Sequence, residues 1–179
     1  MAAVEATLRC PIPSSFRRGL LEYAGEICIE WQLRDKTTMP DAFRQIWAGE
    51  CRWSLASLPT LMDGYRKWLE VFTDPTDKYD GPWQNTFPVL EVGNGDMLGI
   101  DLSVAGQQPV VYLSHEGDDS LHGFWLGCDF EDYVDRLSLL GCVGSEDWQL
   151  LPFVSGSKSL FETDGASAKQ WRQWFGLQL

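Results

Sequence analysis

The chain has 179 residues, 44% of them hydrophobic, and carries 26 acidic against 14 basic side chains, for a net charge of −12. This length fits one domain with a hydrophobic core that needs no disulfide or metal. Because phosphates and anionic membrane surfaces repel a negative protein, the charge argues against nucleic-acid and membrane binding and favours a basic partner. The five cysteines are widely spaced and no signal sequence is evident, so we predict reduced thiols in a cytoplasmic protein.

The first half of the chain predicts two helices and two strands. Apolar residues at helical spacing predict a helix over residues 13–24 and another over residues 59–72. Between them, alternation over residues 27–33 predicts a half-buried strand, and residues 52–55 predict a second, shorter strand. The run of Asp, Pro and Gly over residues 73–84 is typical of a loop.

The second half predicts a meander of strands followed by helices. Residues 87–92 and 97–102 are apolar runs joined through Asn94-Gly95, which is typical of a type I′ hairpin turn with two positive φ angles. Strands at 110–113 and 124–126 extend the meander. Asp129 predicts the N-cap of a helix over 130–140, and residues 166–175 predict a last amphipathic helix. Consecutive strands without helices between them predict an α+β fold with a mainly antiparallel central sheet flanked by helices.

The negative charge lies almost wholly in one part of the sequence. Residues 1–66 hold eight acidic and eight basic residues, whereas residues 67–179 hold 18 acidic and six basic ones. From Tyr79 to Asp135 there are eleven acidic residues and no lysine or arginine. A solubilising surface explains this imbalance as well as a binding face does.

No arrangement of residues typical of catalysis or of metal binding stands out. His115 and His122 flank an acidic turn, but the HExxH zinc motif would need a histidine where Asp119 stands. The spacing of Asp74, Asp77 and Asp80 does not fit a calcium-binding loop. We therefore predict no cofactor, no metal and no enzymatic activity, although a pair of carboxylates for glycoside hydrolysis stays open as an alternative.

Four segments share one further pattern. They are Leu58-Pro59 with the aromatic helix that follows, the run from Gly93 to Leu102, the run from Gln108 to His115, and the run from Leu126 to Val134. Together these segments resemble the SUKH superfamily, the Smi-one/Knr-four-like domains. The resemblance implies a single SUKH-like domain over residues 1–179, with a core at about 13–142 and a C-terminal helical extension at 143–179.

The resemblance also implies a function. Many bacterial members are immunity proteins that bind and neutralise a polymorphic toxin, often a nuclease, and no set of catalytic residues comes with the family. Fungal members act in regulation, so a regulatory or adaptor domain without a toxin partner is the alternative function. A more distant alternative function is an enzyme that acts on a small or cationic substrate. The sequence does not indicate the oligomeric state.

An acidic face can occupy the basic groove with which a nuclease holds its substrate. The predicted partner-binding residues are Glu116, Asp118, Asp119, Asp129, Glu131, Asp132, Asp135, Trp83 and Trp125. The two tryptophans are included because tryptophan near acidic groups often anchors an interface, although each can instead cover the core. Negative charge at 129–132 also stabilises a helix N-terminus whatever the function, so Asp118 and Asp119 are the first choice.

Overall fold

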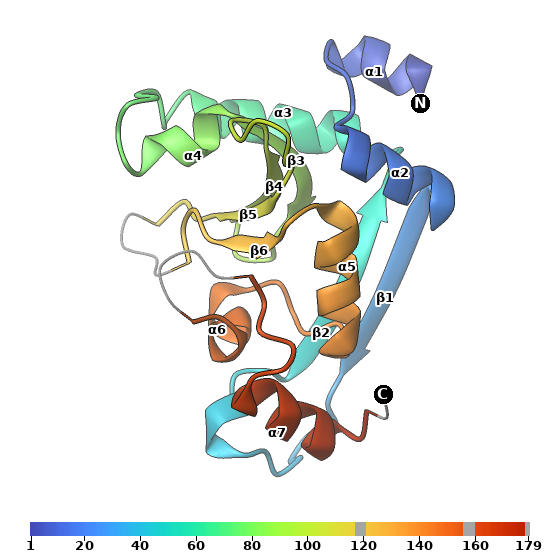
Figure 1. Cartoon of the computed structure of the whole chain (residues 1–179), viewed down its shortest axis with the longest axis vertical. Helices are drawn as coiled ribbons and strands as arrows, with labels where there is room; N and C mark the ends of the chain where they lie inside the picture. Colours follow the sequence, from blue (N-terminus) through green and yellow to red (C-terminus); the bar gives the residue numbers. More distant parts are fainter. Residues whose placement is uncertain (117–120, 156–159, 178–179) are drawn as a thin grey trace.

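The computed structural model describes residues 1–116, 121–155 and 160–177 (Figure 1). The helices are α1 (Ala2–Leu8), α2 (Ser14–Glu22), α3 (Leu58–Leu69), α4 (Asp80–Gln84), α5 (Phe130–Leu139), α6 (Asp147–Leu150) and α7 (Ala166–Phe175), with 3-10 turns η1 (Asp41–Phe43) and η2 (Leu151–Phe153). The strands are β1 (Glu26–Gln32), β2 (Ala48–Ser54), β3 (Thr86–Glu91), β4 (Met97–Asp101), β5 (Val110–Leu113) and β6 (Trp125–Gly127). Within these residues one sheet is a β1–β2 ribbon, the other has the order β3-β4-β5-β6, and all pairings are antiparallel, which confirms the α+β class.

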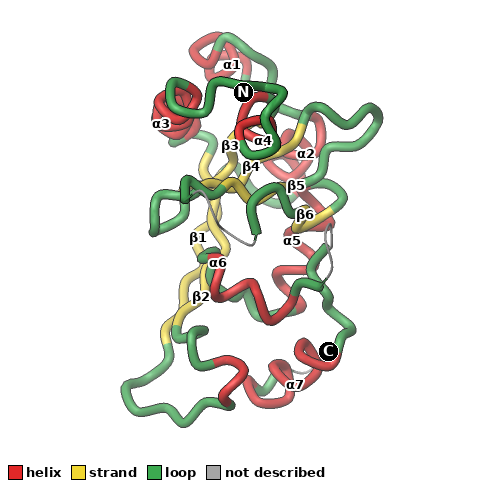
Figure 2. Tube along the Cα trace, turned by 90° about the vertical axis from the view of Figure 1, so that its left-hand side faces the viewer, coloured by secondary structure: helices red, strands yellow, loops and turns green. Residues whose placement is uncertain are grey.

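The two sheets have different surroundings. Helices α3 and α4 lie above the four-stranded sheet in Figure 1, and α5 lies beside it. The long β1–β2 ribbon runs from the level of α2 down to the end of the molecule where α7 lies (Figures 1 and 2). The N-terminus, before α1, and the C-terminus, after α7, therefore lie at opposite ends of the molecule.

The longer helices form where the apolar spacing predicts them. In α3 the buried residues are Leu58, Leu61, Met62 and Tyr65. They stand at positions i, i+3, i+4 and i+7, so they line one face of the helix against the sheet. Helix α5 begins after Asp129, whose carboxylate accepts a hydrogen bond from the backbone N–H of Asp132 at 2.9 Å. The predicted N-cap is therefore confirmed.

The short helices are where the sequence prediction fails. Helices α1 and α6 were not expected, and α4 lies inside the predicted loop 73–84. A helix of four to seven residues has too few turns to show a period, and its stability comes from caps and tertiary contacts. Helix α6, for example, begins with a capping box in which Glu146 and Gln149 bond each other's backbone N–H groups.

The β3–β4 hairpin is confirmed, but its type I′ turn is wrong. Gly95 has a φ of 98°, and Asn94 is not among the described residues with positive φ. The Val92 carbonyl accepts from Gly95 N–H at 3.0 Å, and the Val92 N–H donates to the Asp96 carbonyl at 2.8 Å. A single positive φ is therefore enough, and glycine supplies it without steric cost.

Aromatic side chains join elements that are distant in sequence. The rings of Phe16 in α2 and Phe130 in α5 meet edge to face at a centroid distance of 4.6 Å, and Trp53 of β2 lies 5.3 Å from Phe130. All three side chains are at most 5% exposed. This cluster holds the two helices against the upper half of the ribbon.

A second cluster fixes the lower half of the ribbon to α7. Trp171 is fully buried, packs against Phe43 and Phe153, and donates its indole N–H to the Leu140 carbonyl at 2.7 Å. Its ring centroid also lies 6.2 Å from that of Trp31 in β1. The C-terminal helix thus covers a core belonging to its own chain.

We predict that Trp171→Ala lowers the free energy of unfolding by about 3–5 kcal/mol, because it opens a large cavity and leaves the Leu140 carbonyl unpaired. Urea denaturation followed by circular dichroism measures the change. Trp47→Ala is the matched control, since Trp47 is 55% exposed and its loss should change stability by less than about 0.5 kcal/mol. Equal effects of the two changes would contradict the assignment of Trp171 to the core.

Candidate protein-interaction surface

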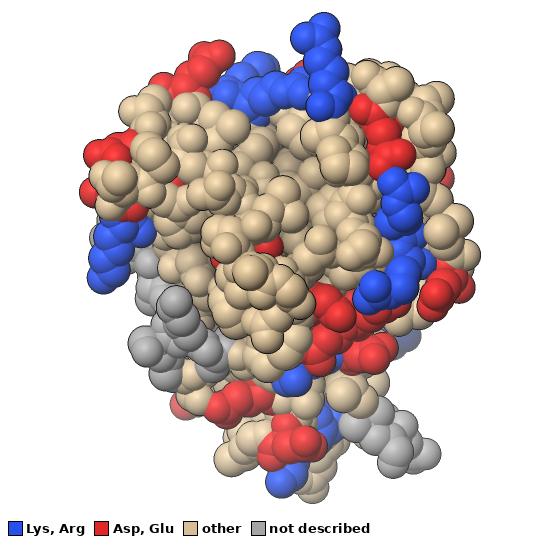
Figure 3. All heavy atoms as spheres, turned by 45° about the horizontal axis from the view of Figure 1, so that its top comes forward, with Lys and Arg blue, Asp and Glu red and all other residues tan. Residues whose placement is uncertain are grey.

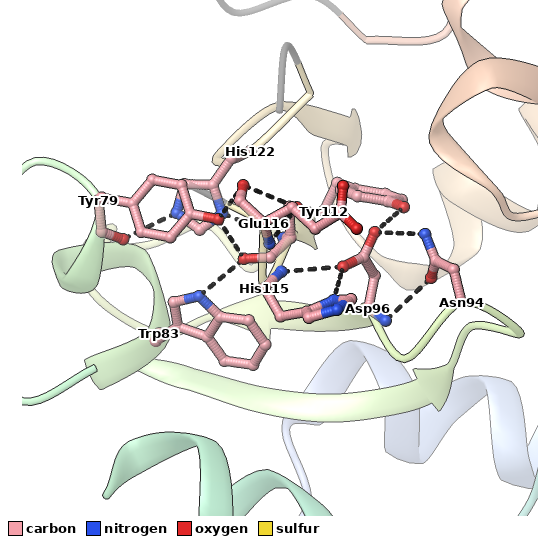
Figure 4. A network of polar contacts seen from close by, with 9 residues as sticks. Tyr79, Trp83, Asn94, Asp96, Tyr112, His115, Glu116 and His122 are labelled. Carbon is pink, nitrogen blue, oxygen red and sulfur yellow. Dashed lines mark hydrogen bonds and ion pairs between the residues drawn. The ribbon is translucent and has the colours of Figure 1, made fainter. Parts of the chain in front are cut away.

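A buried carboxylate joins the segments at one end of the strands of the four-stranded sheet (Figure 4). Asp96 follows the hairpin turn and is 1% exposed. Its Oδ2 accepts from the Tyr112 hydroxyl at 2.5 Å and from the Asn94 amide at 2.7 Å. Its Oδ1 accepts from the His115 backbone N–H at 2.8 Å and lies 2.6 Å from His115 Nδ1. One carboxylate therefore ties the β3–β4 turn to the end of β5.

These hydrogen bonds keep Asp96 ionised. Burial by itself raises the pKa of Asp96, but the hydrogen bonds from Tyr112, His115 and Asn94 outweigh it, so the pKa lies below its usual value. Burial, followed by the hydrogen bond to Asp96, raises the pKa of Tyr112, which stays a neutral donor. The network is saturated by partners within the chain, as expected of a structural element.

A second polar network lies beside the first and orders the segment after β5. The Ser114 carbonyl accepts from Trp83 Nε1 at 3.2 Å and lies 2.7 Å from the Tyr79 hydroxyl (Figure 4). His122 Nδ1 accepts from the Ser114 N–H at 3.1 Å, so the proton of the neutral ring is on Nε2, which donates to the Tyr79 carbonyl at 2.8 Å. Both histidines are thus engaged in holding loops together. Among the described residues, no group of three or more metal-ligating side chains is positioned to hold an ion.

Three of the predicted acidic residues have arginine partners. Arg18 of α2 bonds Glu131 at 2.5 Å and lies 3.7 Å from Asp129. Arg136 bonds Asp132 at 2.8 Å, one turn along α5. The hydrogen bond from Arg18 lowers the pKa of Glu131. These pairs reduce the negative potential that the start of α5 presents to solvent.

The other predicted acidic residues divide into two groups. Glu116 and Asp135 are exposed, and neither forms a salt bridge within the described part of the chain. Asp118 and Asp119 lie outside the described residues. The face seen in Figure 3 has acidic and basic side chains interspersed around a neutral middle, so on this side the acidic residues do not form one patch.

The two predicted tryptophans occupy different environments. Trp83 of α4 is fully buried and stacks on Phe72 at a centroid distance of 4.9 Å. A partner cannot touch it, so its prediction as an interface residue is wrong. It belongs to the core because α4, which was not foreseen, turns its indole inward. Trp125 of β6 is partly exposed, and its place in an interface stays a prediction.

A concave site that the sequence analysis missed lies on the β1–β2 ribbon. It is a cavity of about 470 Å³ whose walls include Glu30, Trp47, Glu50 and Glu146. The sequence analysis singled out none of these four residues. The available signal was the polar face of the alternating strand 27–33, on which Glu30 falls.

The SMI1 / KNR4 family (SUKH-1) matches residues 1–136. The match spans well over half of the chain, so the protein belongs to this family, as its motifs indicated. Comparisons with curated proteins and with solved structures find no match.

Membership in this family indicates a general function. Domains of this family are generally non-catalytic immunity or regulatory domains that bind proteins. The chain is therefore consistent with an immunity-type, protein-binding domain. In the described segments, none of the helices has the length and apolar character required to cross a bilayer.

We predict that the stability contributed by the Asp96 network depends on pH. Because the folded pKa of Asp96 lies below the unfolded value of about 3.9, the unfolded chain binds more protons and the network stabilises the fold fully above that pH. Asp96→Asn should cost about 1–3 kcal/mol at pH 7, since it weakens several hydrogen bonds at a buried site. The difference between wild type and variant should shrink as the pH falls below the unfolded value towards the lower folded pKa. Urea denaturation at each pH measures it, with the exposed Glu70→Gln as control; a difference that stays constant over this range would contradict the role of the charged form.

Proposed function

We propose that the protein is an immunity protein that binds a cognate polymorphic toxin, a nuclease, and neutralises it in the cytoplasm. The observation that carries the proposal is the family match over residues 1–136. The net charge of −12 supports a basic partner, because complementary charge speeds association and disfavours neutral or acidic competitors. All five cysteines are free thiols in the structure, as a reducing compartment requires.

The preferred contacts in this proposal are Glu116 and Asp135, which are exposed and form no salt bridge among the described residues. Asp118 and Asp119, which lie outside the described residues, add two further charges to the same stretch of sequence. The carboxylates of Asp129, Glu131 and Asp132 contribute less, because they already bond Arg18 and Arg136. Trp125 is the aromatic residue retained as a contact.

The direct test is co-expression with the C-terminal domain of the toxin encoded beside this gene. We expect the protein to restore growth and to co-purify with the toxin domain, and we expect the association rate to fall as salt rises. Asp118→Lys with Asp119→Lys should slow association at least about tenfold at low salt. Asp63→Lys on α3 with Glu70→Lys at the C-cap of α3 is the control with the same change in net charge, since both side chains are exposed.

A regulatory adaptor is the second candidate, because the family contains regulatory as well as immunity domains. Absence of a complex with the neighbouring toxin domain, together with unaltered toxicity, would favour it over immunity. A complex whose association rate is the same for the double variant and its control would retain immunity but reject the acidic contacts.

A further inference from the structure

The cavity on the ribbon has walls from three separate parts of the chain. One wall is the β1–β2 ribbon, another is the segment that leads into α6, and Gly93 of the hairpin turn closes a third side. Gln149 holds the α6 wall to the ribbon, because its side-chain amide donates to the Ala48 carbonyl at 3.1 Å. The volume of about 470 Å³ falls within the range of ligand-binding pockets.

Glycines allow the segments around this cavity to pack closely against one another. A Cβ on Gly49 would lie 2.3 Å from the Trp31 indole nitrogen, and a Cβ on Gly93 would lie 2.9 Å from Glu146 Oε1. Trp31 is directly opposite Gly49 in the ribbon and donates its indole N–H to the Gly141 carbonyl at 2.7 Å. The walls are therefore held by packing and hydrogen bonds within the chain, as preorganised binding sites are.

The cavity has more negative charge than the chain neutralises. Glu30 and Glu50 are directly opposite each other in the antiparallel register, an arrangement that is destabilising for like charges. Arg52 forms a salt bridge with Glu50 at 2.6 Å and donates a hydrogen bond to the Glu91 carbonyl at 2.8 Å. Its guanidinium therefore already has two partners within the chain. Glu30 has no salt bridge within the described part of the chain.

Glu146 adds a third carboxylate from the facing wall. Its Oε2 is shielded from solvent and has no hydrogen-bond partner within the described ranges. Burial, followed by the nearby charges of Asp96, Asp147 and Glu50, raises the pKa of Glu146 above its usual value. A buried acceptor without a partner costs free energy, and a cationic donor would remove that cost.

Trp47 supplies an aromatic wall to the same cavity. Its side chain is 55% exposed, which is unusual for an indole, and it precedes β2 beside the two ribbon glutamates. A guanidinium stacks on an indole face and bonds carboxylates through its planar fork, so this combination selects arginine over lysine.

We propose that this cavity binds an arginine side chain presented by the protein partner, with the guanidinium stacked on Trp47 and bonded to Glu30 and Glu146. The inference rests on the proposed function for the existence of a basic protein partner. The proposed contact is on the ribbon and uses none of the acidic residues after β5 or along α5.

The test uses the full-length protein alone and follows its indole N–H resonances by NMR. The probe is N-acetyl-arginine methylamide, and the matched control is its citrulline counterpart, which has the same shape without the charge. We expect saturable shifts of the Trp47 indole resonance with the arginine compound and much smaller shifts with the citrulline one. Glu146→Gln should weaken binding at least about threefold, whereas Glu70→Gln should leave it unchanged. Trp47→Ala should weaken binding by a similar factor, followed in that variant through the indole of Trp31, which also lines the cavity.

Glu146→Gln keeps an oxygen that can accept the capping hydrogen bond of α6, so loss of binding in this variant reports the charge rather than unfolding. Shifts of equal size with citrulline, shifts confined to other indoles, or equal binding of a lysine analogue would each overturn the assignment to an arginine. A toxin complex that Trp47→Ala does not weaken would reject this contact and leave immunity standing. Specific arginine binding without any toxin complex would support the cavity and reject the toxin as its partner.

Discussion

Fourteen basic side chains cannot neutralise 26 acidic ones, so the places where ion pairs form decide which surfaces stay negative. Arg18 and Arg136 compensate the carboxylates at the start of α5. Arg52 forms a salt bridge with Glu50, one of the two facing glutamates on the ribbon, whereas Glu30 has no salt bridge in the part of the chain that the structure describes. The functional proposals depend on this distribution, because an attraction for a basic partner can come only from carboxylates that the chain has not already paired.

The carboxylate of Asp96 stabilises the fold instead of being available to a partner. It is buried, saturated by hydrogen bonds and held ionised by its partners, so it joins the hairpin turn to the end of β5 and offers nothing to a ligand. Glu146 is also shielded, but one of its oxygens has no hydrogen-bond partner among the described residues. The contrast shows why burial alone does not distinguish a structural acid from one available for binding: the number of satisfied lone pairs does.

The strands and longer helices could be predicted because their patterns are local. Alternation identified β1, the turn residues around Gly95 identified the hairpin, and Asp129 with the apolar spacing after it identified α5. The extent of β2 and the existence of α1, α4 and α6 were missed. These elements depend on contacts with distant segments, as when Gln149 bonds the Ala48 carbonyl across the cavity.

The fold class, the family and the excess of negative charge follow from the amino-acid sequence alone, since composition, periodicity and short motifs are readable without coordinates. Three further features depend on how the elements pack: Trp83 is buried, arginines from α2 and α5 pair with the carboxylates at the start of α5, and Glu30, Trp47 and Glu146 line one cavity. Solvent exposure and ion pairing are properties of side chains brought together from distant positions. Spacing along the chain gives no information about them until the elements are packed.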